Sequence, residues 1–273
     1  MDLKGIRAHW QNWARQYGTD LRATTKGTTA KIMEVDALTR TMQQIVVELG
    51  GDLKVLEAGC GNGKNCLSLV DEFAQARFIG FDFIPEMVEA ANAVRSERAD
   101  GGSRLEFFVG NVLEMDLPVA SYDVVFTDRC LINLNTDALQ HQAIRGLADL
   151  VKPGGYLLMI ENSQQTYGRQ NLAREAVGLP ARTPDVFNRF FDETTLLPFL
   201  PTAGLELVGT EDFISLHDLV LYVLVPMTNG GKVDYAHPLV AAATQLNTAL
   251  SAIEPASAGA WGQNRLYKCR KAR

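Results

Sequence analysis

Residues 54–65 read KVLEAGCGNGKN, an apolar segment that ends in an acid and continues into three alternating glycines, Gly59, Gly61 and Gly63. This order predicts a β-strand, a tight turn and the start of a helix at the carboxyl edge of a parallel sheet. Glycine has no Cβ and tolerates positive φ, so the backbone amides of such a turn can approach a ligand closely. The stretch therefore indicates an α/β fold with a nucleoside-type binding site.

Two common phosphate-binding loops differ from this one. The dinucleotide fingerprint has a third glycine where this chain has Lys64, and the triphosphatase loop has Ser or Thr where it has Asn65. Glu57 stands just before the glycines, where its carboxylate would repel a pyrophosphate and attract an ammonium group. The pattern therefore favours a cationic ligand.

A second strand that ends in an acid follows at residues 78–82, which read FIGFD. Pro85 comes next, at a position suited to the first turn of a helix. Asp82 is either the N-cap of that helix or an acceptor for both hydroxyls of a ribose. The glycine loop upstream favours the ribose.

Three more strands are predicted at residues 105–109, 122–127 and 156–160, and the helical patterns between strands include 86–96 and 137–150. Alternating strands and helices predict a parallel sheet covered on both faces. Polar residues follow all five predicted strands, at the edge where such sheets hold their sites.

The runs LEAGCGNGKN (56–65), GNV (110–112), YDVVFTDRCLINL (122–134) and LVKPGGYLLMIE (150–161) occur in this order, with Asp82 after the first. Together they resemble the class I S-adenosylmethionine-dependent methyltransferases over residues 53–160. The fold implied by this resemblance is a seven-stranded, mostly parallel Rossmann-like sheet with helices on both faces.

The resemblance also implies the cofactor, S-adenosyl-L-methionine, and the residues around it. They are Tyr17, Glu57, Ala58, Gly59, Cys60, Gly61, Gly63, Asp82, Phe83, Ile84, Asn111, Val112, Asp128 and Arg129. The glycines would surround the methionine part, with Glu57 near the amino group. Asp82 would bind the ribose, and Phe83 or Ile84 would cover the adenine.

Asn111 and Val112 would meet the adenine edge, where the family usually has Asp in place of Asn111. An Asn carbonyl oxygen can still accept a hydrogen bond, so we expect binding to weaken by about 1 kcal/mol. Asp128 is expected either near the amino or carboxylate end of the cofactor or as a cap of the next helix.

The composition fits a soluble enzyme. A net charge of −6 disfavours a nucleic acid partner, because phosphates require a basic surface. The four cysteines form no CxxC pair, no signal-peptide pattern is visible, and the longest apolar run, 219–225, is too short to span a bilayer. We therefore expect a cytoplasmic protein with no membrane partner; the sequence does not indicate its oligomeric state.

Residues 1–50 are expected to form an N-terminal helical lid on a methyltransferase domain at 51–273. Trp10, Trp13 and Tyr17 recur at helical spacing and would face either the cofactor mouth or the core.

Two further additions, at about 162–200 and 216–260, are expected to form a substrate cap. The first contains Arg169, Arg174, Arg182 and Arg189, which would either bind a substrate anion or lie in solvent. The second separates a sixth strand at 206–214 from a closing antiparallel strand at 264–270. A continuous hairpin over 206–225 is the competing topology.

The chain shows no metal-ligand cluster and no Asn-Pro-Pro-Tyr signature of amino methylation. Methyl transfer from a sulfonium needs an aligned nucleophile, and a hydroxyl nucleophile also needs a base. The candidates for the catalytic residues are His217, then His9, and Asp128. The sequence thus predicts O- or N-methylation of a small molecule. A catalytically inactive cofactor-binding protein, or an aminopropyl-type transferase, is the alternative.

Overall fold

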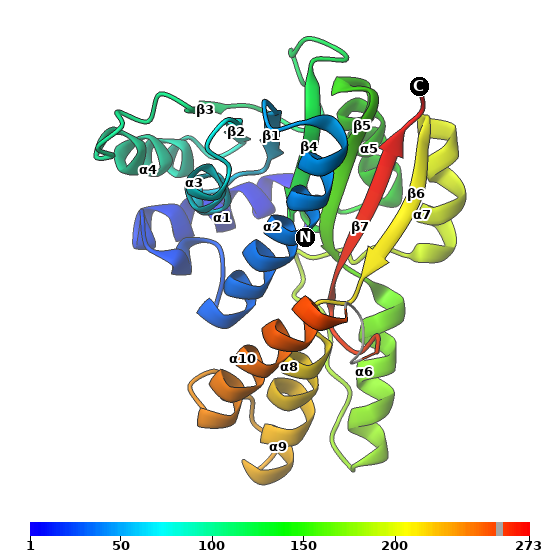
Figure 1. Ribbon diagram of the computed structural model, residues 1–273. Helices are drawn as coiled ribbons and strands as arrows, with labels where there is room; N and C mark the ends of the chain where they lie inside the picture. Colours follow the sequence, from blue (N-terminus) through cyan, green and yellow to red (C-terminus); the bar gives the residue numbers. More distant parts are fainter. Residues whose placement is uncertain (255–258) are drawn as a thin grey trace.

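The computed structural model describes residues 1–254 and 259–273 and contains a seven-stranded sheet (Figure 1). The strands are β1 (Lys54–Ala58), β2 (Arg77–Asp82), β3 (Leu105–Val109), β4 (Tyr122–Asp128), β5 (Val151–Asn162), β6 (Leu205–Glu211) and β7 (Asn264–Lys271). Their order across the sheet is β3-β2-β1-β4-β5-β7-β6, and β1 to β5 run parallel. The predicted α/β fold with a mostly parallel sheet is confirmed.

The strand β7 lies between β5 and β6 and is antiparallel to both. The closing strand predicted at 264–270 is therefore confirmed, and the competing hairpin over 206–225 is wrong. After β6 the chain forms α8 (Ser215–Leu219), the π-helix η4 (Val220–Leu224) and α9 (Val225–Thr228). The apolar residues of this segment pack against the helix at Pro238–Ile253 instead of pairing in the sheet, since Leu221 and Val225 cluster with Val240.

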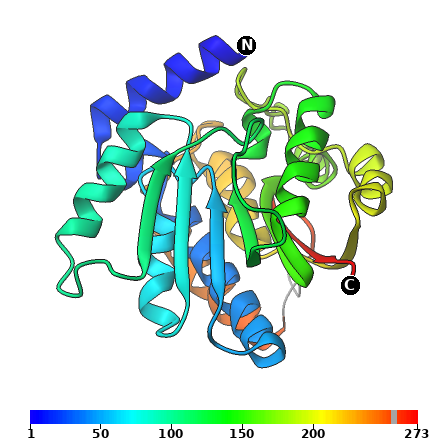
Figure 2. The ribbon, with the colours of Figure 1, turned by 90° about the horizontal axis from the view of Figure 1, so that it is seen from above.

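Helices cover both faces of the sheet (Figure 2). The remaining helices are α1 (Leu3–Tyr17), η1 (Leu21–Ala23), α2 (Thr28–Leu49), α3 (Lys64–Glu72), α4 (Pro85–Ser96), η2 (Leu131–Asn133), α5 (Asp137–Leu150), α6 (Gln164–Ala176), α7 (Glu193–Phe199), η3 (Leu200–Ala203) and α10 (Pro238–Ile253). The helices α2, α3 and α4 pack on one face, and α5 and α7 pack on the other.

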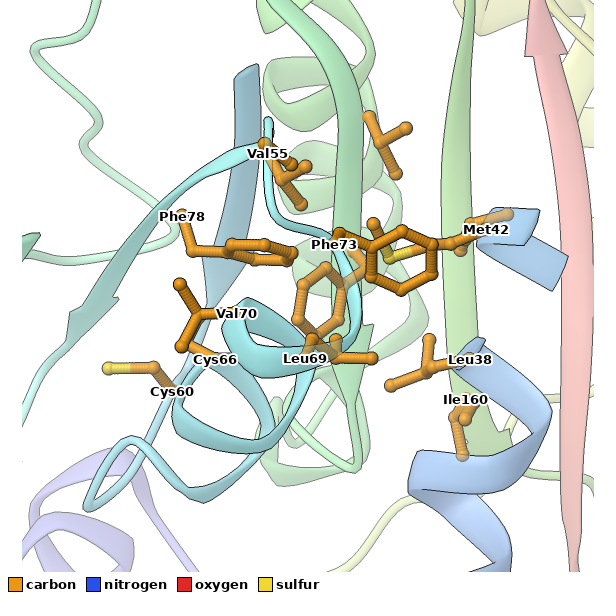
Figure 3. Close-up of a cluster of buried hydrophobic side chains, with 14 of the residues drawn as sticks. Leu38, Met42, Val55, Cys60, Cys66, Leu69, Val70, Phe73, Phe78 and Ile160 are labelled. Atoms are coloured by element: carbon orange, nitrogen blue, oxygen red, sulfur yellow. The ribbon is translucent and has the colours of Figure 1, made fainter. Parts of the chain in front are cut away.

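Successive strand residues alternate between the two cores. Val55 joins the cluster with α2 and α3, whereas Leu56 joins the cluster with α5. Figure 3 shows the first cluster, to which α2 contributes Leu38, α3 contributes Leu69 and β2 contributes Phe78. Each such buried side chain contributes roughly 1.5–3 kcal/mol, so this period of two fixes which strand face each helix covers.

Side chains cap the starts of two helices that cover the sheet. Thr136 accepts a hydrogen bond from the Leu139 amide at the start of α5, and Asp192 accepts one from Thr194 at the start of α7. Both caps satisfy amides that have no partner within the helix.

The additions to the sheet gather at the carboxyl ends of the parallel strands. Figure 1 shows α6, α8, α9 and α10 grouped where β5 ends. The end of α1 meets the start of α4 (Figure 2), and an ion pair of 2.8 Å between Arg15 and Glu86 joins the two helices. Residues 255–258 of the predicted addition at 216–260 lie outside the described residues. Within 1–254 and 259–273, no helix combines the length and hydrophobicity needed to cross a bilayer.

Candidate functional site

A cavity of about 610 Å³ lies at the carboxyl ends of β1, β2, β4 and β5, between the sheet and the additions. The predicted site residues that line it are His9, Glu57, Gly59, Cys60, Gly61, Asp82, Phe83, Ile84, Asn111, Val112, Asp128, Arg129 and His217. Three others do not line it. Ala58 lies in the core, Tyr17 packs with Ile84 and Met87, and Gly63 caps α3.

The glycine loop owes its composition to close packing of the protein itself. Gly59 and Gly61 have φ of +73° and +51°, a region that favours glycine. A Cβ on Gly59 would lie 2.3 Å from the Cys130 sulfur, and one on Gly61 would lie 2.6 Å from a methyl of Thr24. The loop therefore fits closely against β4 and the N-terminal addition, with its backbone facing the cavity.

Asp82 ends β2 and bridges the loop to the next helix. One carboxylate oxygen accepts from the Gly61 amide at 2.8 Å and the other from the Ile84 amide at 2.9 Å. Burial raises the pKa of Asp82, although these amides oppose the shift. Each oxygen has a second lone pair. The carboxylate can thus organise the loop and still accept from two ligand hydroxyls.

The carboxylate of Glu57 is buried between β1 and α3. It accepts hydrogen bonds from the Asn65 amide nitrogen at 2.7 Å and the Cys66 thiol at 3.0 Å. Burial raises the pKa of Glu57 to about 7. A cation bound nearby would favour the ionised form of this carboxylate.

A charge cluster, formed by Lys31, Glu34, Asp128 and Arg129, lies beside Glu57. The Lys31 ammonium donates to Asp128 and lies 2.8 Å from Glu34, and the Arg129 guanidinium lies 2.9 Å from Glu34. Burial opposes charge here, yet Lys31 and Arg129 hold the pKa of Asp128 below its ordinary value. Asp128 is thus an ion-pair partner, and the alternative that it caps the next helix is wrong.

Near the glycine loop, two buried oxygens at the cavity wall have no hydrogen-bond partner among the described residues. They are Oδ1 of Asp128 and Oδ1 of Asn62, a residue of the glycine loop. Buried polar atoms are normally satisfied, so both are available to donors of a ligand. The chemistry of this part of the cavity fits an amino acid end with both charges. Asp128 and Glu57 suit an ammonium. Lys31 also donates to the Asn65 side-chain oxygen at 3.3 Å, a long hydrogen bond that it can exchange for one to a carboxylate.

Arg129 has a left-handed backbone, with φ of +55°. Such a conformation is uncommon outside glycine and costs about 1–3 kcal/mol. It is held by a hydrogen bond from the Arg129 amide to the Ile160 carbonyl at 2.7 Å. The bend directs the chain from β4 across the cavity into η2.

The opposite side of the same cavity is apolar. Ile84, Met87 and Val112 line it, and Arg7 lies 4.7 Å from the ring centroid of Phe83. Oδ1 of Asn111 accepts from the Leu113 amide at 3.1 Å. Its side-chain nitrogen has no hydrogen-bond partner among the described residues, so it is available as a donor.

Aromatic side chains from α1 and from the 162–200 addition form a wall of the cavity. His9 stacks on Phe187 with centroids 4.3 Å apart, and Trp10 lies 5.8 Å from the same ring. Trp10 also donates to Asn133 at 3.0 Å, which ties α1 to η2. Trp10 therefore lines the cavity and also packs against the protein, so the two roles predicted for α1 coexist.

Of the four arginines in the 162–200 addition, Arg182 lines the cavity. Its guanidinium lies 3.5 Å from the Tyr222 ring centroid and donates to Gln170 and Gln263. Arg174 is buried and donates to the Pro180 and Tyr222 carbonyls, and Arg189 pairs with Asp137. Arg174 therefore holds the fold together, whereas the paired Arg189 side chain is still 40% exposed and Arg169 lies in solvent.

The candidate bases differ in their hydrogen-bond partners and in their burial. His217 is fully buried, with Thr29 Oγ1 3.0 Å from Nε2 and Asp218 Oδ1 2.9 Å from Nδ1. The buried Nε2 of His9 has no hydrogen-bond partner within the described part of the chain, and burial lowers the pKa of this imidazole. Glu161 accepts from Thr127 and from the Leu131 amide behind the cavity wall.

Sequence reasoning missed Lys31, Thr29 and Asp218, which reach the cavity from α2 and α8. Lys31 pairs with Asp128 across 97 positions, and Thr29 meets His217 across 188. Glu34 at i+3 from Lys31 was the local signal of a buried ion pair, and the polar, threonine-rich run at 24–29 was a general signal for Thr29, but nothing local pointed to Asp218.

Residues 49–187 match the family model described as a methyltransferase domain, which is half of the chain. A demethylmenaquinone methyltransferase of Deinococcus radiodurans is 27% identical over 108 residues, 40% of this chain and 42% of that protein. A 27-O-demethylrifamycin SV methyltransferase of Amycolatopsis mediterranei is 28% identical over 157 residues, 58% of this chain and 52% of that protein. The chain spans about half the length of the curated relatives it matches.

Solved structures share the fold over most of the chain. Magnesium protoporphyrin IX methyltransferase from Synechocystis PCC 6803, with bound S-adenosylhomocysteine, is 16% identical with a TM-score of 0.57 and covers 90% of this chain and 86% of its own. The [4+2]-cyclase SpnF is 20% identical with a TM-score of 0.56 and covers 87% and 80%. At these identities the likeness shows the fold alone.

Proposed function

Because this chain belongs to the class I S-adenosylmethionine-dependent methyltransferases, we propose that it transfers the methyl group of S-adenosyl-L-methionine to a small molecule bound in the aromatic part of the cavity. The observation that carries the proposal is the continuity of this cavity, which is lined at one end by Asp82 and the glycine loop and at the other by Trp13, Tyr167 and Phe187. Such a cavity holds a cofactor and an acceptor side by side and excludes water.

The cofactor is expected to lie with its adenosine along Asp82, Phe83 and Val112 and its methionine part at the charge cluster. The bound cofactor supplies an activated methyl group. The protein then needs to align an acceptor atom with that group, which the rigid strand ends and the packed aromatic wall are suited to do.

A small acceptor is supported by the shape and chemistry of the second half of the cavity. Several aromatic side chains line it, and the flat rings of Tyr167 and Phe190 meet edge to face with their centroids 5.0 Å apart. The relatives named above act on demethylmenaquinone and 27-O-demethylrifamycin SV, and another is a phosphoethanolamine N-methyltransferase. We infer an acceptor with a flat apolar body for this chain.

The cofactor site is tested by Asp82→Ala. We expect titration calorimetry to show a loss of S-adenosylmethionine affinity of at least tenfold, because the substitution removes the ribose acceptor and the anchor of the Gly61 amide. Asp116→Ala is the matched control, since Asp116 does not line this cavity. Unchanged affinity in the Asp82 variant would refute the assignment.

Lys31 argues for methyl transfer from the intact cofactor rather than aminopropyl transfer, whose donor lacks the carboxylate. We expect Lys31→Met to weaken S-adenosylmethionine binding by about 10- to 100-fold, the worth of a hydrogen bond to a charged group. Affinity for decarboxylated S-adenosylmethionine should change far less. Lys4→Met, which removes a lysine that does not line the cavity, is the control. Equal losses for both ligands would show that Lys31 supports the fold and does not contact the carboxylate.

A further inference from the structure

Within the described residues that line the cavity, His217 is an imidazole with a polar partner on each ring nitrogen. Oδ1 of Asp218 lies 2.9 Å from Nδ1, and the other Asp218 oxygen accepts from the Gln263 amide at 2.8 Å. A carboxylate can only accept, so Nδ1 carries a proton, and in the neutral imidazole Nε2 is left as the acceptor. Thr29 Oγ1, 3.0 Å from Nε2, is therefore the donor.

His217 itself is 1% exposed, whereas Thr29 is half-buried and lines the cavity. An acceptor molecule thus meets the threonine hydroxyl before it can meet the imidazole. A hydroxyl is both a donor and an acceptor, so Thr29 can take a proton from the cavity while it passes its own to Nε2. The geometry is that of a base that acts through a relay.

We propose that Thr29, His217 and Asp218 form a proton relay and that the acceptor of this methyltransferase carries a hydroxyl group, which makes the reaction an O-methylation. This inference rests on the function proposed above. Neutral amines and carboxylates are nucleophiles without a base, whereas a neutral hydroxyl must lose its proton as it reacts.

The proposed reaction is a single displacement, in which one bond forms as another breaks and the proton moves along the relay. The acceptor oxygen forms a bond to the methyl carbon, and the carbon–sulfur bond breaks with its electron pair on sulfur. The acceptor proton moves to Thr29 Oγ1 as the threonine proton moves to His217 Nε2. The resulting imidazolium is stabilised by the Asp218 carboxylate, which acts as a positioning residue.

The scaffold around the relay is rigid. Oδ1 of Asn247 in α10 accepts from the Leu216 amide at 3.1 Å and from the His217 amide at 3.4 Å, so the helix that carries the imidazole is fixed to a neighbouring helix. A contact that only tied α2 to α8 would need neither a cavity-lining hydroxyl nor a buried carboxylate on the far nitrogen. The arrangement therefore favours a role in proton transfer over a purely structural one.

Other side chains at the cavity are less suited to this task. Asp128 pairs with Lys31, and Asp185 lies 3.1 Å from Lys26. His9 lacks a carboxylate on its second nitrogen among the described residues, so nothing comparable orients its ring or stabilises its charged form.

The test uses the full chain, radiolabelled S-adenosylmethionine and a panel of flat aromatic acceptors. The panel contains phenols of graded acidity, including 4-nitrophenol and 4-methoxyphenol, hydroxynaphthalenes, and the matching anilines and carboxylates. The methylated atom is identified by mass spectrometry. We expect methyl transfer to hydroxyl groups.

The variants are Thr29→Val, His217→Asn and Asp218→Asn, with Thr28→Val and His141→Asn as matched controls that do not line the cavity. On weakly acidic phenols we expect a loss of about 10²–10⁴-fold in kcat, the usual contribution of a general base. On 4-nitrophenol, which is already ionised at pH 8.5, the loss should be less than tenfold. A purely structural role would lower both rates equally and would overturn the relay.

A second measurement needs no turnover. Nitrogen-15 NMR of the cofactor-free protein should show one of the four histidines with a protonated Nδ1 and an accepting Nε2, and this signal should disappear in His217→Asn. The opposite tautomer would refute the relay. In Asp218→Asn the fixed tautomer should be lost while the circular dichroism spectrum is retained.

The outcomes separate the relay from the function on which it rests. Methyl transfer to amines or carboxylates alone refutes the relay and leaves the methyltransferase proposal intact. Tight cofactor binding with no methyl transfer to any compound of the panel counts against both.

Discussion

Glu57 lies in surroundings that oppose its own charge. Burial raises its pKa to about 7, although Cys66 and Asn65 donate to it and Lys31 is near. In the cofactor-free protein, the Glu57 carboxylate is therefore partly protonated at neutral pH. A cationic ligand would reverse this, because it favours the ionised form.

The first prediction concerns this residue. The folded pKa of Glu57 is raised above its ordinary value of 4.5, so its contribution to stability is complete below about pH 4.5 and is lost as the pH rises through 7. We expect Glu57→Gln to raise the free energy of unfolding of the cofactor-free protein at pH 8, by about 1 to 3 kcal/mol, and to leave it nearly unchanged at pH 4.5. Urea unfolding at the two values checks this.

The same substitution should weaken S-adenosylmethionine binding at pH 8, and affinity of the unchanged protein should fall as the pH drops below 7. Calorimetry over pH 5.5–8.5 measures both. Opposite signs for stability and affinity would identify Glu57 as a ligand contact, whereas a loss of both would indicate a role in the fold alone.

At the scale of elements, α1 lies over the aromatic half of the cavity, with Trp10 and Trp13 in its wall. The small cluster beneath it, which includes Ala14, Ile84 and Met87, is separate from the two cores of the sheet. Changes in α1 should therefore affect the cavity more than the sheet.

The second prediction follows from this arrangement. We expect the double substitution Trp10→Ala and Trp13→Ala to raise KM for an aromatic acceptor at least tenfold, because it removes two rings of the wall. S-adenosylmethionine affinity should change less than threefold, since the glycine loop and Asp82 remain. Val47→Ala, at an exposed position of α2, is the control. Equal losses for cofactor and acceptor would contradict a role specific to the acceptor.

Local patterns predicted the elements well where the pattern repeats over a whole strand or helix. The apolar run of β1 and the glycines after it predicted the strand, the turn and the start of α3, and the α5 helix was placed correctly at 137–150. The 219–225 run could not be assigned, because a short apolar segment fits a strand and a buried helix equally. Its contacts with α10 decide the matter.

At the site, the residues that follow strands could be predicted because parallel strands bring their carboxyl ends to one edge. Glu57, Asp82 and Asp128 were found in this way. Lys31, Thr29 and Asp218 could not be, since they come from helices whose approach to that edge depends on tertiary packing. The acidic residues could thus be predicted from local sequence, whereas the residues that reach the cavity from helices are known only from the folded structure.

At the scale of the whole molecule, the cavity joins parts of the chain that lie far apart in sequence. The sheet supplies Asp82, α2 supplies Lys31, and α8 supplies His217. A ligand that contacts all of these binds the folded chain and not the unfolded one, so it stabilises the whole fold.

The third prediction is a thermal shift. At a concentration one hundred times its Kd, S-adenosylmethionine should add about 2.7 kcal/mol of stability, which for a chain of this size corresponds to roughly 5–10 °C in Tm. Scanning calorimetry with and without the cofactor measures it. The Asp82→Ala variant should show little shift at the same concentration, and a full shift in that variant would place the cofactor elsewhere.

The strand order also bears on how the chain folds during synthesis. β6 is made well before β7, yet β7 is its sole neighbour in the described sheet and also covers the edge of β5. Until residues 264–271 have been translated, β5 presents an unpaired apolar edge and β6 cannot join the sheet. An uncovered edge of this kind promotes pairing between chains. The nascent protein therefore depends on this late strand to escape aggregation, and a mutation that weakens β7 would reduce its yield in cells before it changed anything in the cavity.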